Sequence, residues 1–368
     1  MSTRASVPVN VPEPPLGHIP GALSAAAAQP QRISTGSLPD PGLVRRLLDE
    51  AHRRFVPVQD GAVADYIPAL AAADPDRFGL AIVSATGERY AVGDARHPFT
   101  IQSVSKPFVF ALVANALGHE QVKQLLGVNN SGLPFDSVIA VELNPGRTAN
   151  PMVNAGAIAT TSLVPGADAA AKWEFVRAGL SRFAGRELAM DEEVYESESR
   201  TNDRNEGIAR LLKGYGRIYS DPLEATDVYT RQCSLLVTTE DLAVMGATLA
   251  DGGVNPITRE RVIDADSCKR TLAVLATAGM YERSGEWLYE VGLPAKSGVG
   301  GGIITVIPGK GGLASYSPLL DDAGNSVRGT LATAFLSTTL GLNVFASAPL
   351  PFPEPTPSPA LPPPPLVE

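Results

Sequence analysis

The uneven distribution of proline limits which parts of this 368-residue chain can fold. Seven of its 32 prolines lie in the first 40 residues, and ten lie among the last 20. Such segments favour extended polyproline-like backbone and cannot bury a core. We therefore predict disordered extensions at residues 1–40 and 349–368, with one folded body from 41 to 348. The second extension suits an SH3-type partner, although a solvated tail is the commoner outcome for such a sequence.

The composition of the chain excludes several classes of function. The net charge is −9, whereas a protein that binds nucleic acid or an anionic membrane needs a basic face. We therefore expect no nucleic-acid partner. With four histidines and two cysteines in the whole chain, a structural zinc site is not expected and a disulfide framework is excluded.

The sequence predicts neither export nor membrane insertion. No apolar run approaches the ~18 residues that a membrane helix needs. The amino-terminal stretch MSTRASVPVNVPEPPLGHIPG lacks the uninterrupted apolar core of a signal peptide. A content of two cysteines also fits a reducing compartment. We therefore expect a cytoplasmic protein without a membrane partner.

Hydrophobic spacing predicts a mixed α and β body. Helices are expected at 43–55 and 326–340, and the region from 108 to about 280 is mainly helical. The strings GLAIVS and RYAVG read as two strands, and strand signals return at 295–307. Strands at both ends predict a sheet lobe of residues 41–107 and 285–348, with an inserted helical lobe at 108–284. A cleft between these lobes is the natural place for an active site.

The first candidate for chemistry is an S-x-x-K spacing at Ser103 and Lys106, at the start of an apolar helical run. Residues i and i+3 share a helix face, so these two side chains can meet, whereas Ser105 points elsewhere. A lysine with a lowered pKa can remove the proton that makes a serine hydroxyl a poor nucleophile. Alone, the spacing is weak evidence, because a serine three residues before one of seven lysines often arises by chance.

A second motif, Lys296-Ser297-Gly298, strengthens the first. A K-[ST]-G on a strand is the usual companion of S-x-x-K in penicillin-recognising enzymes. At this point a surface lysine beside a strand turn explains the motif equally well. The glycines that follow do not form a phosphate-binding loop, since the G-x-x-x-x-G-K-[ST] spacing is absent from the sequence.

Longer strings decide between these interpretations, and they occur in a fixed order: VADYIPALA, FTIQSVSKPF, NPMVNAGAI, ESESRTNDRN, DVYTRQCS, GATLADGGVNPIT, GMYERSGEW and GLPAKSGVGGGI. Over about residues 43–345 the chain resembles the serine-dependent glutaminase family. The resemblance implies an α+β fold of the β-lactamase/transpeptidase type, with an antiparallel sheet built from both ends of the body, flanking helices and an inserted helical lobe. It also implies hydrolysis of L-glutamine to L-glutamate and ammonia, without a metal or organic cofactor, by a homodimer or homotetramer.

The resemblance also implies roles for individual residues. Ser103 matches the nucleophile, Lys106 its base, and Tyr281 a residue that passes a proton to the leaving ammonia. Tyr66 matches a tyrosine that holds the nucleophile region, and the backbone N–H of Val299 joins that of Ser103 in an oxyanion hole. The remaining matches are side chains that bind the substrate, namely Gln102, Asn154, Glu198, Asn205 and Tyr229.

These roles agree with the chemistry of a free amino acid, which carries one ammonium and one carboxylate. Glu198 is the natural partner of the ammonium, and Asn205 with Tyr229 are natural donors to the carboxylate. Two other functions stay open. A penicillin-recognising hydrolase of the same fold would need export and an S-x-N element, and a catalytically silent amino-acid sensor would not need both Ser103 and Lys106.

Overall fold

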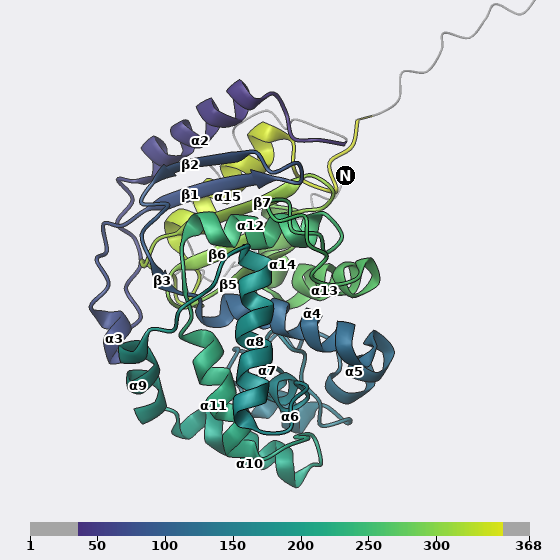
Figure 1. Ribbon diagram of the computed structural model, residues 1–368. Helices are drawn as coiled ribbons and strands as arrows, with labels where there is room; N and C mark the ends of the chain where they lie inside the picture. Colours follow the sequence, from purple (N-terminus) through teal and green to yellow (C-terminus); the bar gives the residue numbers. More distant parts are fainter. Residues whose placement is uncertain (1–35, 349–368) are drawn as a thin grey trace, which may run out of the picture.

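A five-stranded antiparallel sheet, in the order β2-β1-β7-β6-β5, organises the fold (Figure 1). The computed structural model describes residues 36–348, so the predictions for residues 1–35 and 349–368 lie outside the described residues. Two of the strands come from the amino-terminal part of the body and three from the carboxyl-terminal part: β1 (Gly79–Ser84), β2 (Arg89–Gly93), β5 (Ala295–Ser297), β6 (Gly302–Ile307) and β7 (Gly311–Tyr316). The expected antiparallel sheet from the two ends of the body is therefore present.

Side chains of the sheet pack on both of its faces. On β1, Leu80 and Ile82 join the core under helices α2 (Pro41–Phe55) and α15 (Val327–Leu340). The alternate residues Ala81 and Val83 join the core under α12 (Thr239–Ala250) on the other face. Residues that alternate in a strand point to opposite faces. The strands β1 and β6 are therefore buried throughout, which explains their near-continuous apolar sequence, whereas only Tyr90 is buried in the edge strand β2.

The strand β7 is the element of the sheet that hydrophobic spacing did not predict. Its sequence, GGLASY, begins with two glycines and does not alternate between apolar and polar residues. Gly312 faces α12, where an added Cβ would lie 2.3 Å from the carbonyl oxygen of Ala243. A glycine here lets the helix approach the sheet closely, at the expense of the strand signal. The helices predicted at 43–55 and 326–340 are present as α2 and α15, each within two residues of its expected start.

Helices occupy most of the chain between β2 and β5. A short two-stranded sheet pairs β3 (Phe99–Thr100) with β4 (Leu236–Val237), and the 3₁₀ turns are η1 (Gln102–Ser105) and η2 (Tyr281–Arg283). The helices of this region are α3 (Pro68–Ala71), α4 (Lys106–Leu117), α5 (His119–Leu126), α6 (Ile139–Leu143), α7 (Asn154–Ser162), α8 (Ala169–Ala184), α9 (Glu192–Arg200), α10 (Asp203–Gly214), α11 (Pro222–Cys233), α13 (Ala265–Ala278) and α14 (Ser284–Glu290). Figure 1 shows α7 to α11 gathered below the sheet. The helix α12 lies within residues 108–284, the range predicted for the helical lobe, but it packs against the sheet instead.

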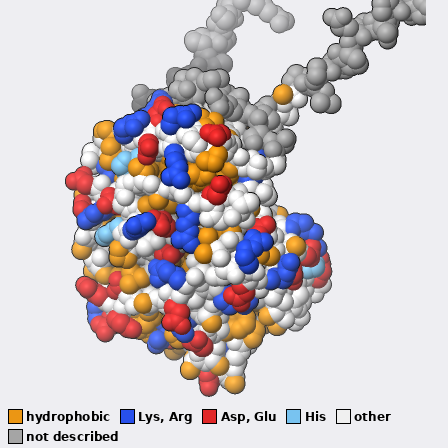
Figure 2. Space-filling view, turned by 45° about the horizontal axis from the view of Figure 1, so that its top comes forward, with side chains coloured by type: hydrophobic (Ala, Val, Ile, Leu, Met, Phe, Trp, Pro, Cys, Tyr) orange, Lys and Arg blue, Asp and Glu red, His pale blue; other side chains and the backbone are white. Residues whose placement is uncertain are grey.

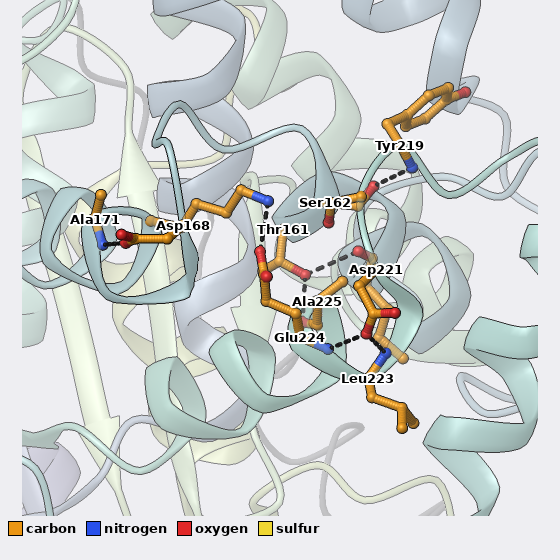
Figure 3. Close-up of polar contacts among 12 residues, drawn as sticks. Thr161, Ser162, Asp168, Ala171, Tyr219, Asp221, Leu223, Glu224 and Ala225 are labelled. Atoms are coloured by element: carbon orange, nitrogen blue, oxygen red, sulfur yellow. Dashed lines mark hydrogen bonds and ion pairs between the residues drawn. The ribbon is translucent and has the colours of Figure 1, made fainter.

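Polar contacts join α7, α8 and α11 at the far end of the helical region (Figure 3). The hydroxyl of Thr161 on α7 donates to the carbonyl of Ala225 on α11 at 3.0 Å. Lys172 on α8 forms an ion pair with Glu224 on α11 at 2.7 Å. Asp221 caps the first turn of α11. The Thr161 bond therefore holds α7 against α11, the helices that carry Asn154 and Tyr229, and the ion pair holds α8 against α11.

Charged side chains of both signs are interspersed over the face of the molecule in Figure 2. Ion pairs such as Arg182–Glu260, at 2.6 Å, lie at the surface, where each contributes about 0–1 kcal/mol to stability.

No helix within residues 36–348 combines the length and the apolar character that a bilayer crossing requires.

Candidate active site

Eight of the ten predicted site residues line one cavity of about 390 Å³. The cavity lies where the sheet meets the helical region, between the segment after β5, the turn η1 and the helices α7, α9, α10 and α11. The eight residues are Tyr66, Gln102, Ser103, Asn154, Glu198, Asn205, Tyr229 and Val299. Lys106 and Tyr281 are buried and contact residues of the cavity from behind.

The turn that carries Ser103 is fixed on both sides. Before it, β3 pairs with β4, and the N–H of Ile101 donates to the carbonyl of Leu235 at 2.8 Å. After it, the chain continues into α4, with Pro107 in the first turn of the helix. Side chains at i and i+3 eclipse in a 3₁₀ turn, so η1 puts Ser103 and Lys106 on one face. The residue before the serine, Gln102, has a φ of +49°, a conformation that costs a non-glycine residue free energy.

Lys106 is a buried amine in polar surroundings. Its Nζ donates to Oδ1 of Asn154 at 2.7 Å and to the carbonyl of Met152 at 3.4 Å, and it lies over the ring of Tyr229. Burial lowers the pKa of Lys106 to about 8, while the charge of Glu198 acts in the opposite direction. An amine with such a pKa is partly neutral at pH 7 and mostly neutral above about pH 8, and its neutral form can accept a proton as a general base must.

Asn154 is the centre of a polar network that reaches from α7 to α10 and α11. Its Oδ1 also accepts from the Tyr229 hydroxyl at 3.2 Å, and its Nδ2 donates to Oδ1 of Asn205 at 3.0 Å. Asn205 donates in turn to Asn202, which donates to Thr230. Each amide therefore has a fixed orientation, because its oxygen accepts a hydrogen bond and its nitrogen donates one.

Glu198 is the buried carboxyl of the cavity. Burial raises its pKa to about 7, and the hydrogen bond from Gln102 (Nε2 to Oε2, 3.4 Å) and the charge of Lys106 oppose that rise. A carboxylate in this position gains stability from any cation that enters the cavity, since a nearby positive charge favours the ionised form.

Tyr281 lies with the Lys296-Ser297-Gly298 motif behind the nucleophile. Its hydroxyl donates to the carbonyl of Ser297 at 3.0 Å, and its φ is +57°. Burial raises its pKa, whereas a hydrogen bond with Ser103 lowers it. The Nζ of Lys296 lies 4.0 Å from the centre of the Tyr281 ring, and burial together with the charge of Lys106 lowers the pKa of Lys296 well below its usual value.

The segment after β5 passes close to the nucleophile turn. A Cβ added to Gly298 would lie 3.1 Å from the carbonyl oxygen of Ile101 and 3.3 Å from the backbone nitrogen of Val104. The next residue, Val299, packs against Ala64 and Leu320. Val299 and Ser103 both line the cavity. Tyr66 also lines the cavity, and 54% of this residue is exposed.

Comparisons with known proteins identify the family of this chain. The glutaminase family model matches residues 61–345. The chain is 59% identical over 318 residues to Glutaminase 2 of Yersinia pestis, covering 86% of this chain and 93% of that protein. It is 50% identical over 307 residues to a glutaminase of Colwellia psychrerythraea, covering 83% of this chain and 99% of that one. The chain belongs to the glutaminase family.

Two solved structures resemble this glutaminase over nearly their whole length. A structure described as the probable glutaminase ybaS has a TM-score of 0.82 and 45% identity, covering 84% of this chain and 100% of that one. A probable glutaminase from Bacillus subtilis, in complex with 6-diazo-5-oxo-L-norleucine, has a TM-score of 0.74 and 32% identity, covering 85% and 99%. Both support the mixed α and β architecture with its antiparallel sheet.

Several residues of the glutaminase cavity are absent from the predicted set, among them Phe135, Asp136 and Arg204. Arg204 forms an ion pair with Asp136 at 2.9 Å and adjoins Asn205 in the sequence, so the ESESRTNDRN string carried a signal for it. No comparable signal marked Phe135 and Asp136, which lie in an irregular segment. Within residues 36–348, no cluster of three or more His, Cys, Asp or Glu side chains is arranged to hold a metal ion.

Proposed function

We propose that this glutaminase hydrolyses L-glutamine through an acyl-enzyme on Ser103, with Lys106 as the base. The observation that carries the proposal is the buried Lys106 amine, with a pKa near 8, one turn after a serine that lines the cavity. The Ser103 Oγ forms a bond to the side-chain amide carbon while its proton passes to Lys106. The C–N bond then breaks, and the departing nitrogen takes a proton from Tyr281 and leaves as ammonia. The proton taken up by Lys106 replaces the one that Tyr281 gave, and water then hydrolyses the ester, which releases L-glutamate and restores Ser103.

The polar groups of the cavity match the two charged ends of the substrate. Glu198 pairs with the ammonium, and Asn205 donates the second N–H of its amide to the carboxylate. Tyr229 donates to the carboxylate by turning its hydroxyl away from Asn154, while Gln102 and Asn154 border the side-chain amide. A site with fixed partners for both ends discriminates against amides that lack them, because its buried polar groups would lose their partners.

The developing negative charge on the amide oxygen needs donors of its own. The backbone N–H groups of Ser103 and Val299 are suited to this role, since Gly298 lets the two segments approach within van der Waals contact. Tyr66 holds the nucleophile region from the exposed side of the cavity. This arrangement of S-x-x-K with K-S-G supports assignment of the fold to the β-lactamase/transpeptidase type.

The remaining expectations concern the setting of the enzyme. The expected cytoplasmic location is supported by the low cysteine content, with Cys233 and Cys268 both free and buried. A homodimer or homotetramer is expected from the family. Sedimentation velocity of the full chain, with and without L-glutamate, would measure the oligomeric state directly.

One experiment tests the proposed reaction against its alternatives. Ammonia release from L-glutamine and L-asparagine is measured beside hydrolysis of a penicillin, with the same enzyme preparation. We expect turnover of L-glutamine well above the other two. Turnover of the penicillin alone would assign a lactam-recognising hydrolase, and tight binding of L-glutamine without turnover would assign an amino-acid sensor.

A further inference from the structure

A buried chain of hydrogen bonds supports the nucleophile turn from the side opposite the cavity. The Oγ of Ser105 donates to the carbonyl oxygen of Gln102 at 2.7 Å. The Nε2 of Gln232, on α11, donates to the Oγ of Ser105 at 3.1 Å. Ser105 and Gln232 are both fully enclosed, with at most 1% of either residue exposed. Neither of them lines the cavity that holds Ser103.

The direction of this chain is fixed by the chemistry of its members. The carbonyl of Gln102 can only accept, and the hydroxyl of Ser105 has a single proton to donate. If Gln232 were turned so that its Oε1 faced Ser105, two acceptors would compete for that proton. With its Nε2 towards Ser105, the hydroxyl proton is directed at Gln102. The orientation leaves Gln232 Oε1 buried and without a hydrogen-bond partner among the described residues. Such a polar atom carries a desolvation cost.

The chain ends on the strained residue of the turn. Gln102 has a φ of +49°, a conformation that is strained for a residue with a side chain and persists only when its surroundings enforce it. The hydrogen bond from Ser105 is one such constraint, because it holds the Gln102 carbonyl in a single direction. A relaxed turn would rotate the peptide between Gln102 and Ser103.

That peptide also carries a group with a catalytic task. The C=O of Gln102 and the N–H of Ser103 belong to one planar trans peptide, so they point in opposite directions. Fixing the carbonyl towards Ser105 therefore aims the N–H of Ser103 to the other side. An oxyanion donor is effective only when its direction is set before the charge develops.

We propose that Ser105 and Gln232 are positioning residues that orient the Ser103 N–H for the oxyanion. This inference rests on the proposed acyl-enzyme reaction. The oxyanion forms only in the tetrahedral intermediate. Loss of these two hydrogen bonds therefore lowers kcat while substrate binding stays nearly unchanged. The role belongs to the Ser105 hydroxyl and to the Gln232 amide that directs its proton.

The test compares Ser105→Ala with a matched control, Ser234→Ala. Ser234, the residue after α11, is equally buried, and its hydroxyl donates to the carbonyl of Thr230 in the last turn of that helix. For Ser105→Ala we expect kcat for L-glutamine to fall at least tenfold, towards the ~10²–10³ loss of a whole donor. KM and the dissociation constant of L-glutamate should change less than about threefold. Ser234→Ala should retain its kcat, and Ser105→Thr, which keeps the hydroxyl, should recover most of the activity.

Gln232→Met supplies a second measurement that does not alter the turn itself. Without the amide, the Ser105 hydroxyl can rotate, and we expect a several-fold lower kcat with unchanged L-glutamate binding. The double variant Ser105→Ala/Gln232→Met should be no slower than Ser105→Ala, because the two residues act as one unit. If Ser105→Ala fails to fold, Gln232→Met decides alone, and a normal kcat in it overturns the inference.

The outcomes separate this inference from the proposed reaction. A normal kcat in folded Ser105→Ala, together with an inactive Ser103→Ala, overturns the positioning role and leaves the acyl-enzyme intact. Equal losses of kcat and of L-glutamate affinity would assign Ser105 a structural role only. Retained turnover in Ser103→Ala would overturn the acyl-enzyme proposal itself.

Discussion

The Nζ of Lys106 lies 2.7 Å from the Oδ1 of Asn154, so the proposed base is held by a residue that lines the substrate cavity. The same oxygen accepts a hydrogen bond from Tyr229, and the amide nitrogen of Asn154 is used by Asn205. The neutral amide satisfies the lysine without adding charge. Burial therefore keeps the pKa of Lys106 low, which a carboxylate in the same place would prevent.

Substituting Asn154→Asp tests this relationship. A carboxylate 2.7 Å from the Lys106 amine would raise the pKa of Lys106, because an opposite charge stabilises the protonated form. We expect kcat near pH 7 to fall at least tenfold and to recover partly as the pH rises above 8. Asn154→Ala serves as the comparison, since it removes the contact without adding charge. A parallel loss at every pH in both variants would contradict the electrostatic explanation.

The pH dependence of the wild-type enzyme follows from two groups. Lys106, with a pKa near 8, accepts a proton only in its neutral form, so the rate should fall as the pH decreases below about 8. Glu198, with a pKa near 7 in the free protein, binds an ammonium only when ionised, so kcat/KM should fall more steeply below about 7. Glu198→Gln should lose that second ionisation and raise KM strongly. An unchanged profile in Glu198→Gln would exclude this residue from substrate binding.

Ser103 and Lys106 should behave as one unit. Ser103→Ala and Lys106→Ala are each expected to remove most turnover, and the double variant should be scarcely slower than either. Steady-state ammonia release, with melting curves as the control for folding, provides the measurement. Complete inactivity of Ser105→Ala beside an active Ser103→Ala would instead make Ser105 the nucleophile.

The sequence predicted the elements whose signals are local. The signals for the strands β1 and β2 and for the helices α2 and α15 come from neighbouring residues, and the structure contains these elements. The sequence strings that carry the candidate site residues are also local, and eight of those residues line one cavity. The strand β7 was missed because its glycines serve the contact with α12, which lies about 65 residues earlier in the chain. The hydrogen bonds from Gln232 to Ser105 and from Ser105 to Gln102 were missed for the same reason. The first joins residues 127 positions apart in the sequence, and the second depends on the backbone angle φ of Gln102.

The amino-terminal boundary of the folded body gives a prediction on stability. Asp40 caps α2 by accepting from the N–H of Leu43 at 3.1 Å, and Leu38 packs against the core under this helix. A chain trimmed to residues 36–348 should keep its melting temperature and its glutamine turnover. A chain trimmed to 41–348 should lose about 1 kcal/mol of folding free energy with the cap. Equal stability of both trimmed chains in urea would contradict this role of Asp40.

The last prediction concerns Val299, whose proposed contribution is a backbone N–H. Val299→Ala keeps the N–H and loses only part of the packing against Ala64 and Leu320, so we expect a mild decrease in kcat. Val299→Pro removes the N–H, and we expect kcat to fall by about 10²–10³, with a much smaller effect on L-glutamate binding. Proline could also distort the segment after β5, so the variant must first show a melting curve and an L-glutamate affinity like those of the wild type. A folded Val299→Pro enzyme that binds L-glutamate and keeps a normal kcat would remove Val299 from the oxyanion hole.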